Sequence, residues 1–147
     1  PSVLAQVREG VRARLGDSLH TLALGGAALD PDWPPILQAM GIRAEVGYGL
    51  TEAGTVVTVN ELKPFRSDTV GLPIPGTHLE VRNRNAVGVG EVWIQGETDM
   101  KGYLDAPELT KEVLVDGWLA TGGGGVVSYP RFWQYPTPFW GNPGSRE

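Results

Sequence analysis

Apolar residues recur at helical spacing at the start of the chain. They follow Ser2, a suitable N-cap, and they stop before Gly16, a suitable C-terminal cap. This pattern predicts a helix over about 3–15. The apolar run over about 19–24 is short and continuous, which is typical of a buried parallel strand. The residues at helical spacing are Val3, Leu4, Val7, Val11 and Leu15.

A second helix and a second strand are predicted next. Asp30-Pro31-Asp32 has the order of a helix start, with a cap, an N1 proline and a first-turn acid. Gly41 ends this helix, and the following strand is predicted over about 43–47. The first part of the chain is therefore predicted to be a piece of a parallel α/β sheet. The apolar face of the second helix consists of Trp33, Ile36, Leu37 and Met40.

The pattern changes after Thr51. Polar and apolar residues alternate around Leu79 and Val81 and again over 91–95, which predicts an antiparallel hairpin. The fold class is therefore α/β, with a parallel α/β part over 1–65 and a smaller antiparallel β-rich part over 66–122. The other predicted elements are a strand over 56–59, turns over 71–76, a loop over 83–89, a helix over 107–114 and a strand over 118–121.

Regular patterning ends at Gly122. A glycine run occupies 122–125, and the segment over 129–140 crowds aromatic residues between prolines, which break helices and central strands. Residues 123–147 therefore form an atypical tail. Two interpretations are open: an extended or disordered tail, or an arm that buries its aromatic rings on its own body or on another copy.

Composition excludes several functional classes. The chain has 147 residues, enough for one ordinary domain or two small ones, and a net charge of -5, which argues against a nucleic-acid partner. It has no Cys, which excludes disulfides and thiolate sites and agrees with a cytoplasmic location. No apolar run approaches a transmembrane segment, and because the chain begins at Pro1 we expect a processed or excised piece.

The segment Gly47-Tyr48-Gly49-Leu50-Thr51-Glu52-Ala53 follows a predicted buried strand. In open α/β sheets, ligands bind at the carboxyl ends of the strands. There the Tyr48 ring can stack on a purine, the Thr51 hydroxyl can donate to a phosphate, and the Glu52 carboxylate can hold Mg²⁺ beside phosphates. An ordinary glycine-rich turn with a half-buried tyrosine is the alternative interpretation.

Four sequence blocks occur in a fixed order along the chain. They are Gly25-Gly26-Ala27-Ala28-Leu29, the block over 47–52, the block over 90–96 with 100–104, and the block over 116–122. This ordered set resembles the adenylate-forming (AMP-binding) enzymes, which include acyl-CoA synthetases, peptide-synthetase adenylation domains and luciferases. It is most similar to bacterial long-chain fatty acid–CoA ligases, and the resemblance covers roughly residues 1–122.

The resemblance implies a fragment of the large N-terminal domain of an AMP-forming acyl-CoA ligase. In that family a carboxylate, here a fatty acid, attacks the α-phosphorus of ATP, and CoA then displaces AMP from the acyl-adenylate. ATP or AMP, Mg²⁺ and CoA are thus the implied cofactors. The implied nucleotide-binding residues are Gly25, Gly26, Ala27, Tyr48, Gly49 and Thr51; the implied catalytic residues are Thr51 and Glu52, with Glu52 as the metal ligand.

The chain departs from the family pattern in ways that predict inactivity on its own. Gly123 stands where the family has an aspartate that binds the ribose hydroxyls. The 147 residues contain neither the family's phosphate loop nor its small C-terminal domain with the catalytic lysine. A frameshift near the codon for residue 123 is one hypothesis for the unusual tail.

Several notable side chains receive a structural interpretation. We expect Trp93, Trp118 and Tyr103 to pack rather than to bind ligand, and His20 and His78 lack metal-site spacing. Lys101 and Lys111 are expected to be solvated surface charges.

Three alternative functions stay open. One is a fragment of an amino-acid or aryl-acid adenylating enzyme. Another is a non-catalytic, self-associating module derived from the family, which predicts a homo-oligomer. The third is a generic nucleotide-binding protein.

Overall fold

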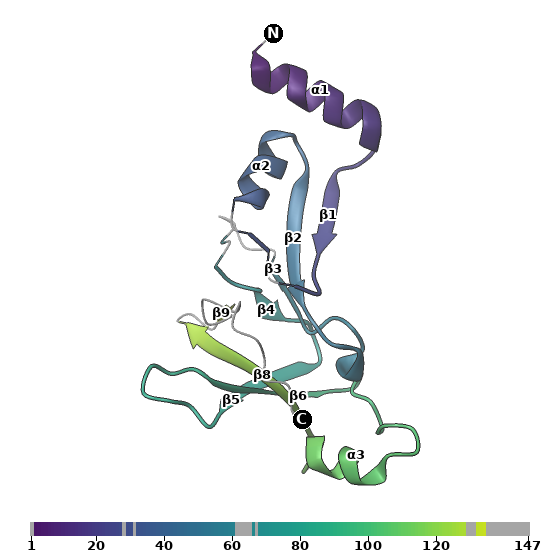
Figure 1. Cartoon of the computed structure of the whole chain (residues 1–147), viewed down its shortest axis with the longest axis vertical. Helices are drawn as coiled ribbons and strands as arrows, with labels where there is room; N and C mark the ends of the chain where they lie inside the picture. The colour runs from purple at the N-terminus through teal and green to yellow at the C-terminus, as the bar shows by residue number, and fades with distance from the viewer. Residues whose placement is uncertain are drawn as a thin grey trace, which may run out of the picture.

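The computed structural model describes residues 2–27, 29–30, 32–60, 66, 68–128 and 132–134, with the backbone alone at residues 4, 126–128 and 132–134. The molecule is elongated, with α1 at one end and α3 at the other (Figure 1). The elements are α1 (Val3–Leu15), β1 (Thr21–Leu24), α2 (Trp33–Ala39), β2 (Arg43–Tyr48), the 3-10 turn η1 (Thr51–Ala53), β3 (Thr58–Asn60), β4 (Leu72–Pro73), β5 (Thr77–Arg82), β6 (Gly90–Gly96), α3 (Pro107–Val113), β7 (Leu114–Val115), β8 (Trp118–Ser128) and β9 (Phe132–Gln134).

The first sheet has the strand order β1-β2-β3-β4. β1 and β2 run parallel, with Leu24 opposite Val46, whereas β2–β3 and β3–β4 are antiparallel pairs. The predicted parallel α/β piece is thus confirmed, and the sheet continues beyond it as a mixed sheet. Because the carboxyl ends of β1 and β2 meet at one edge, the loops that follow them lie side by side.

The two N-terminal helices differ in how well the sequence predicted them. α1 has the predicted bounds, and the Ser2 hydroxyl accepts a hydrogen bond from the Ala5 amide at 3.3 Å. The predicted start of α2 at Asp30 is wrong: the helix begins at Trp33, with Asp32 at the N-cap position. The prolines in its first turn are Pro34 and Pro35, which cannot donate backbone hydrogen bonds and therefore suit that position.

The second sheet has the order β5-β6-β8-β7, and β9 pairs with β8. The predicted hairpin is confirmed, with β5 and β6 antiparallel from Thr77↔Gly96 to Arg82↔Glu91. β8 is longer than predicted, because strand pairing continues through the glycine run to Ser128. The segment predicted as turns over 71–76 contains β4.

The two interpretations of the aromatic tail fall mostly on residues outside the described part of the chain.

One hydrophobic core joins the two sheets. Its buried members come from η1 and the loop beside it, from the segment before β4, and from strands β5, β6 and β8. Tyr48 and Leu50, at the end of β2, pack against this core. The buried members are Ala53, Val57, Val70, Val81, Val92, Ile94 and Leu119.

Buried polar side chains fasten the chain before β4 onto β3. The Thr58 hydroxyl donates to the carbonyl of Val70 at 2.7 Å. The Asn60 amide donates to the carbonyls of Arg66 and Thr69 at 2.7 and 2.8 Å. These bonds satisfy polar groups that are costly to bury unpaired, and they attach the backbone at Arg66, Thr69 and Val70 to β3.

A cation–π cluster covers the outer face of the second sheet. The Arg82 guanidinium lies 4.3 Å from the ring centroid of Trp93 and 4.7 Å from that of Trp118, and it pairs with Glu80 at 2.9 Å. The predicted packing role of both tryptophans is therefore confirmed.

In the described part of the chain, no helix has the length and apolarity that crossing a bilayer requires.

Gly49 is required by a close backbone approach. A Cβ atom built there would overlap the carbonyl group of Thr55 and the Cα atom of Val56. At Gly10, in the middle of α1, nothing lies within 4 Å of the position that a Cβ atom would take. The two glycines therefore provide a matched pair of substitution sites.

We expect Gly49→Ala to lower the free energy of unfolding by about 1–3 kcal/mol, because a backbone segment must move to accept the methyl group. Gly10→Ala should raise it by about 0.5–1 kcal/mol, since alanine favours the helix. Urea denaturation followed by circular dichroism measures both. Equal stability of Gly49→Ala and the unchanged chain would contradict the close approach.

Candidate functional site

The turn after β1 lies against the end of β2. A Cβ atom on Gly25 would lie 3.3 Å from the carbonyl oxygen of Gly47, so the two backbones approach closely at this edge. Gly25, Gly26 and Ala27 are all exposed, and Gly26 has a positive φ of 83°. The backbone of this turn, which the resemblance assigns to nucleotide binding, is thus accessible beside Tyr48.

Tyr48 connects the first sheet to β8. It is the last residue of β2, it lies opposite Thr58, and its half-buried ring packs against the shared core. Burial raises the pKa of the Tyr48 hydroxyl, a hydrogen bond with the Thr121 side chain lowers it, and the charge of Glu52 raises it. The net shift is upward, so the hydroxyl keeps its proton across the physiological range.

The turn η1 presents the two candidate catalytic side chains. Its shape is set by hydrogen bonds to the Leu50 carbonyl from the amides of Ala53 and Thr55, at 3.1 and 3.0 Å. Ala53 is buried, which anchors the turn in the core, whereas Thr51 is exposed. Within the described part of the chain the Thr51 hydroxyl has no hydrogen-bond partner.

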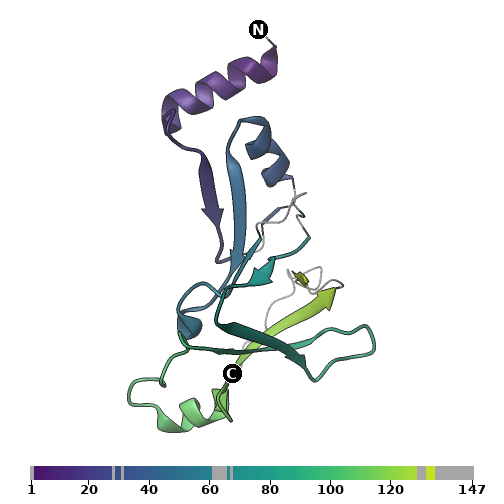
Figure 2. The same ribbon diagram turned by 180° about the vertical axis from the view of Figure 1, so that it is seen from behind.

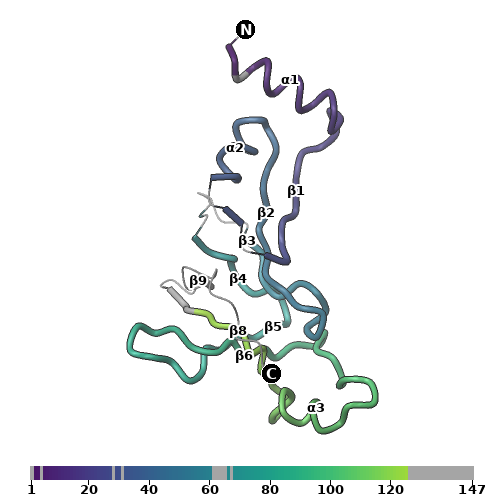
Figure 3. Tube along the Cα trace, in the orientation of Figure 1, coloured from purple at the N-terminus to yellow at the C-terminus, as the bar shows by residue number. Residues whose placement is uncertain are grey.

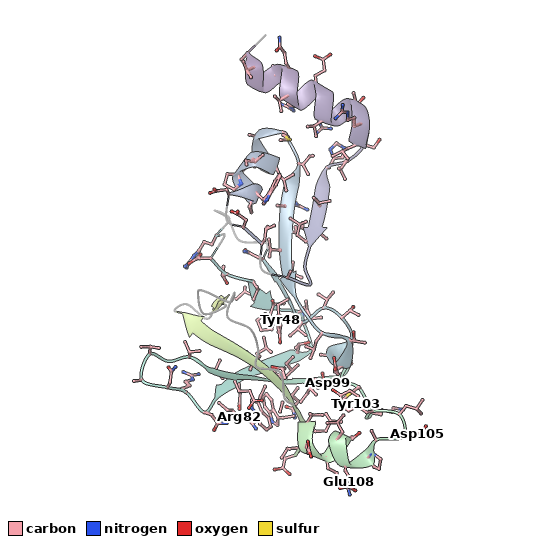
Figure 4. All side chains as sticks on the ribbon, viewed as in Figure 1. Tyr48, Arg82, Asp99, Tyr103, Asp105 and Glu108 are labelled. Carbon is pink, nitrogen blue, oxygen red and sulfur yellow. The ribbon has the colours of Figure 1, made fainter. Side chains whose placement is uncertain are left out.

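The loop between β6 and α3 clamps η1 from the other sheet. The Met100 amide donates to the Glu52 carbonyl at 2.7 Å, and the Thr98 hydroxyl donates to the Ala53 carbonyl at 3.1 Å. The Tyr103 hydroxyl donates to Glu52 Oε1 at 2.9 Å. Figure 4 shows Tyr103 and Asp99 in this loop, with Tyr48 at the junction of the two sheets.

Sequence reasoning missed the contact between Tyr103 and the candidate metal ligand. The two residues are 51 positions apart, and periodicity and spacing carry no information about a pair so distant. An aromatic hydroxyl beside Gly102, in a loop between a strand and a helix, was the available signal. Its partner became visible only in the fold.

The Thr121–Gly122 segment is also held in place, by Glu91. Glu91 accepts the Gly122 amide on Oε1 at 3.1 Å and the Trp93 indole N–H on Oε2 at 2.9 Å. The Thr121 hydroxyl donates to the Val92 carbonyl at 2.8 Å. Gly123 follows without a side chain, so the carboxylate expected for ribose binding has no counterpart at this position.

The donor set fits a metal that arrives with phosphate ligands. Within the described residues there is no group of three or more His, Cys, Asp or Glu side chains that could hold a metal ion. Glu52 Oε2 accepts no hydrogen bond from these residues. Mg²⁺ commonly binds through one or two carboxylates together with substrate phosphates, and a single free carboxylate oxygen suits that mode.

The profile of the AMP-binding enzyme family matches residues 1–104. The chain belongs to the AMP-binding enzyme family. Two similar relatives are a long-chain-fatty-acid–CoA ligase from Yersinia pestis, 45% identical over 83 residues, and the ligase FadD15 from Mycobacterium bovis, 30% identical over 122 residues. The matches cover 52% and 83% of this chain, but 15% and 20% of those ligases.

Solved structures show a similar fold. The amide bond synthetase McbA from Marinactinospora thermotolerans aligns with a TM-score of 0.74 at 30% identity, over 90% of this chain and 29% of that one. The N-terminal domain of FACL13 from Mycobacterium tuberculosis aligns with a TM-score of 0.71 at 23% identity, over 89% and 36%. The chain is thus homologous to one segment of AMP-forming acyl-CoA ligases. The roles of the individual site residues stay predictions.

The two tyrosines of the site are expected to make the free energy of unfolding fall at alkaline pH. The hydrogen bond to Glu52, then burial and the Glu52 charge, raise the pKa of Tyr103 above its ordinary value of 10.0. Because both tyrosine pKa values are raised in the folded chain, their stabilisation is fully present below about pH 10 and is lost as pH rises through the folded-state pKa.

We expect Glu52→Gln to lower the pKa of Tyr103 and to flatten this loss of stability. Tyrosinate absorbance, titrated for the unchanged chain and for Tyr103→Phe, assigns the shifted hydroxyl. Glu108→Gln is the control, because Glu108 pairs with Lys111 at 2.8 Å on the surface of α3. An unchanged Tyr103 titration in Glu52→Gln would show that the hydrogen bond does not form in solution.

Proposed function

We propose that this chain forms part of the nucleotide site of an AMP-forming fatty acid–CoA ligase, which activates a fatty acid with ATP and transfers it to CoA. The observation that carries the proposal is the clamped turn after β2. It presents the Thr51 hydroxyl and Glu52 Oε2, which have no hydrogen-bond partner among the described residues, at the same sheet edge as Gly25 and Tyr48. Open α/β sheets bind ligands at such edges.

Each side chain receives a role that its surroundings support. The turn of Gly25, Gly26 and Ala27 offers exposed backbone to an adenine ring, and Tyr48 offers an aromatic face. Gly49 lets the backbone reach this position, and Thr51 donates to the α-phosphate. Glu52 would hold Mg²⁺, which supplies positive charge to the developing negative charge on the phosphoryl group.

The fatty acid is favoured over an amino acid or an aryl acid because the similar curated ligases, at 30–45% identity, are named for long-chain fatty acids. CoA as the thiol acceptor rests on the same names. Fatty acid metabolism is thus the proposed process. A cytoplasmic location stays a prediction.

The 147-residue chain by itself is expected to form no acyl-CoA. It contains neither the phosphate loop nor the lysine of the family pattern, and phosphoryl chemistry depends mainly on such electrostatic groups. Mass spectrometry of a reaction with ATP, Mg²⁺, CoA and a fatty acid is the direct measurement. Acyl-CoA above a no-protein control would contradict this expectation.

Nucleotide binding is expected to be no tighter than about millimolar. Stacking contributes about 1–3 kcal/mol and a neutral hydrogen bond about 0.5–1.5 kcal/mol. A millimolar dissociation constant already needs about 4 kcal/mol after the loss of translational freedom. Titration with ATP·Mg²⁺, followed by NMR, should therefore show weak, fast-exchange shifts at residues 25–27 and 48–52.

Tyr48→Ala should abolish these shifts, whereas Trp118→Phe, on the outer face of the second sheet, should preserve them. Gly123→Asp should recover little affinity, because the neighbouring glycines have no side chains to orient the new carboxylate. Micromolar binding that disappears in Tyr48→Ala would show that these residues form a stronger site than proposed. Chemical-shift changes that are the same in Tyr48→Ala as in the unchanged chain would contradict the proposed adenine site.

The exposed N-terminal helix favours a second candidate function, self-association. α1 projects beyond the sheets in both views (Figures 1 and 2), and Val3, Val7 and Leu15 are 76%, 45% and 57% exposed. Arg12 ties it to the body by donating to the Gly41 carbonyl at 3.0 Å. β1 also lies at the edge of its sheet, so unpaired backbone groups and an apolar helix face both favour a homo-oligomer.

Sedimentation velocity at tens of micromolar is expected to show a species larger than a monomer. The double change Val3→Lys and Val7→Lys should shift the distribution to monomer, because it places charges on the apolar stripe. Gln6→Lys with Ala13→Lys adds the same charge to the other side of α1 and is the control. A monomer in the unchanged chain, or equal dissociation in both double variants, would contradict association through this face.

A further inference from the structure

The contact between Tyr103 and Glu52 joins two elements that are each fixed by other bonds. On one side, η1 is held by its own turn hydrogen bonds and by the burial of Ala53. On the other side, the Tyr103 amide donates to the Thr110 hydroxyl at 2.9 Å, and that hydroxyl donates to the Ala106 carbonyl at 2.9 Å. The hydroxyl of Tyr103 therefore approaches Glu52 from a loop anchored on α3.

The hydrogen bond distinguishes the two oxygens of the Glu52 carboxylate. Oε1 accepts from Tyr103 at 2.9 Å, whereas Oε2 has no partner among the residues that the structure describes. A glutamate side chain has several rotatable bonds, and an anchored oxygen restricts them. The free oxygen is thus held in one direction before any ligand arrives.

We propose that Tyr103 is a positioning residue, which orients the Glu52 carboxylate so that Oε2 alone ligates a nucleotide-bound divalent cation. This inference rests on the proposed function, because it assigns Glu52 to the cation. Orientation in advance lowers the ordering cost of binding.

A second bond on the same turn provides a matched control. The Thr98 hydroxyl donates to the Ala53 carbonyl at 3.1 Å, so Thr98 also fastens η1 to the loop, but it does not reach the carboxylate. Tyr103→Phe and Thr98→Val each remove one hydroxyl from this clamp. A purely structural role of the clamp predicts similar effects of both variants, whereas positioning of the carboxylate predicts an effect of Tyr103→Phe alone.

The probe is Mn²⁺·ATP, whose paramagnetic cation broadens nearby amide signals in a ¹H–¹⁵N spectrum. We expect the unchanged chain to show broadening centred on residues 51–53 that grows with Mn²⁺·ATP concentration. Tyr103→Phe should raise the concentration needed for half-maximal broadening by about three- to tenfold, the scale of one lost hydrogen bond. Thr98→Val should change it by less than twofold, and Glu52→Gln should abolish the localised effect.

The outcomes separate this inference from the proposed function. Localised broadening that Glu52→Gln removes but Tyr103→Phe leaves unchanged would overturn the positioning role and keep the metal-binding role of Glu52. Equal weakening by Tyr103→Phe and Thr98→Val would also overturn it, in favour of a general clamp. Broadening that is not localised at residues 51–53 in the unchanged chain would overturn both proposals.

Discussion

The packing of η1 against the second sheet is the interaction on which the rest of the structure depends. Ala53 and Val57 lie in the same buried cluster as Val92, Ile94 and Leu119, with relative exposures of 6% or less. This cluster is the core that the two sheets share, so losing it would separate the sheet that carries Tyr48 from the loop that carries Tyr103. Burial of apolar surface thus positions the polar groups of the candidate site.

Local signals explain which elements the sequence predicted. α1 combines an N-cap, helical spacing and a terminal glycine, and all three describe contacts within a few residues. β8 was predicted too short because its glycine run lacks a pattern, and its pairing with β6 joins residues far apart in the sequence (Figure 3). The start of α2 was misplaced because Asp30 and Asp32 are both suitable caps, and the sequence does not rank them.

The same division applies to the site. The candidate residues at the end of β2 and in η1 were predictable because a ring, a hydroxyl and a carboxylate fall within one short segment at the end of a predicted strand. Their clamp was not predictable, since Thr98, Met100 and Tyr103 reach the turn only through the pairing of β5, β6 and β8. Sequence identified the candidate site residues, and the fold was needed to show what orients them.

The two walls of the proposed nucleotide site are held to different degrees. Glu52 is fixed by a backbone bond and a side-chain bond from the second sheet, at 2.7 and 2.9 Å. The Gly25–Ala27 turn follows the four-residue edge strand β1, and in the described part it takes part in no turn or side-chain hydrogen bond. Segments with few such restraints open at low free energy, and a ligand that needs them must order them on binding. The expected weakness of nucleotide binding therefore has a cause within this chain: the proposed phosphate side is preorganised, whereas the proposed adenine side depends on an edge strand.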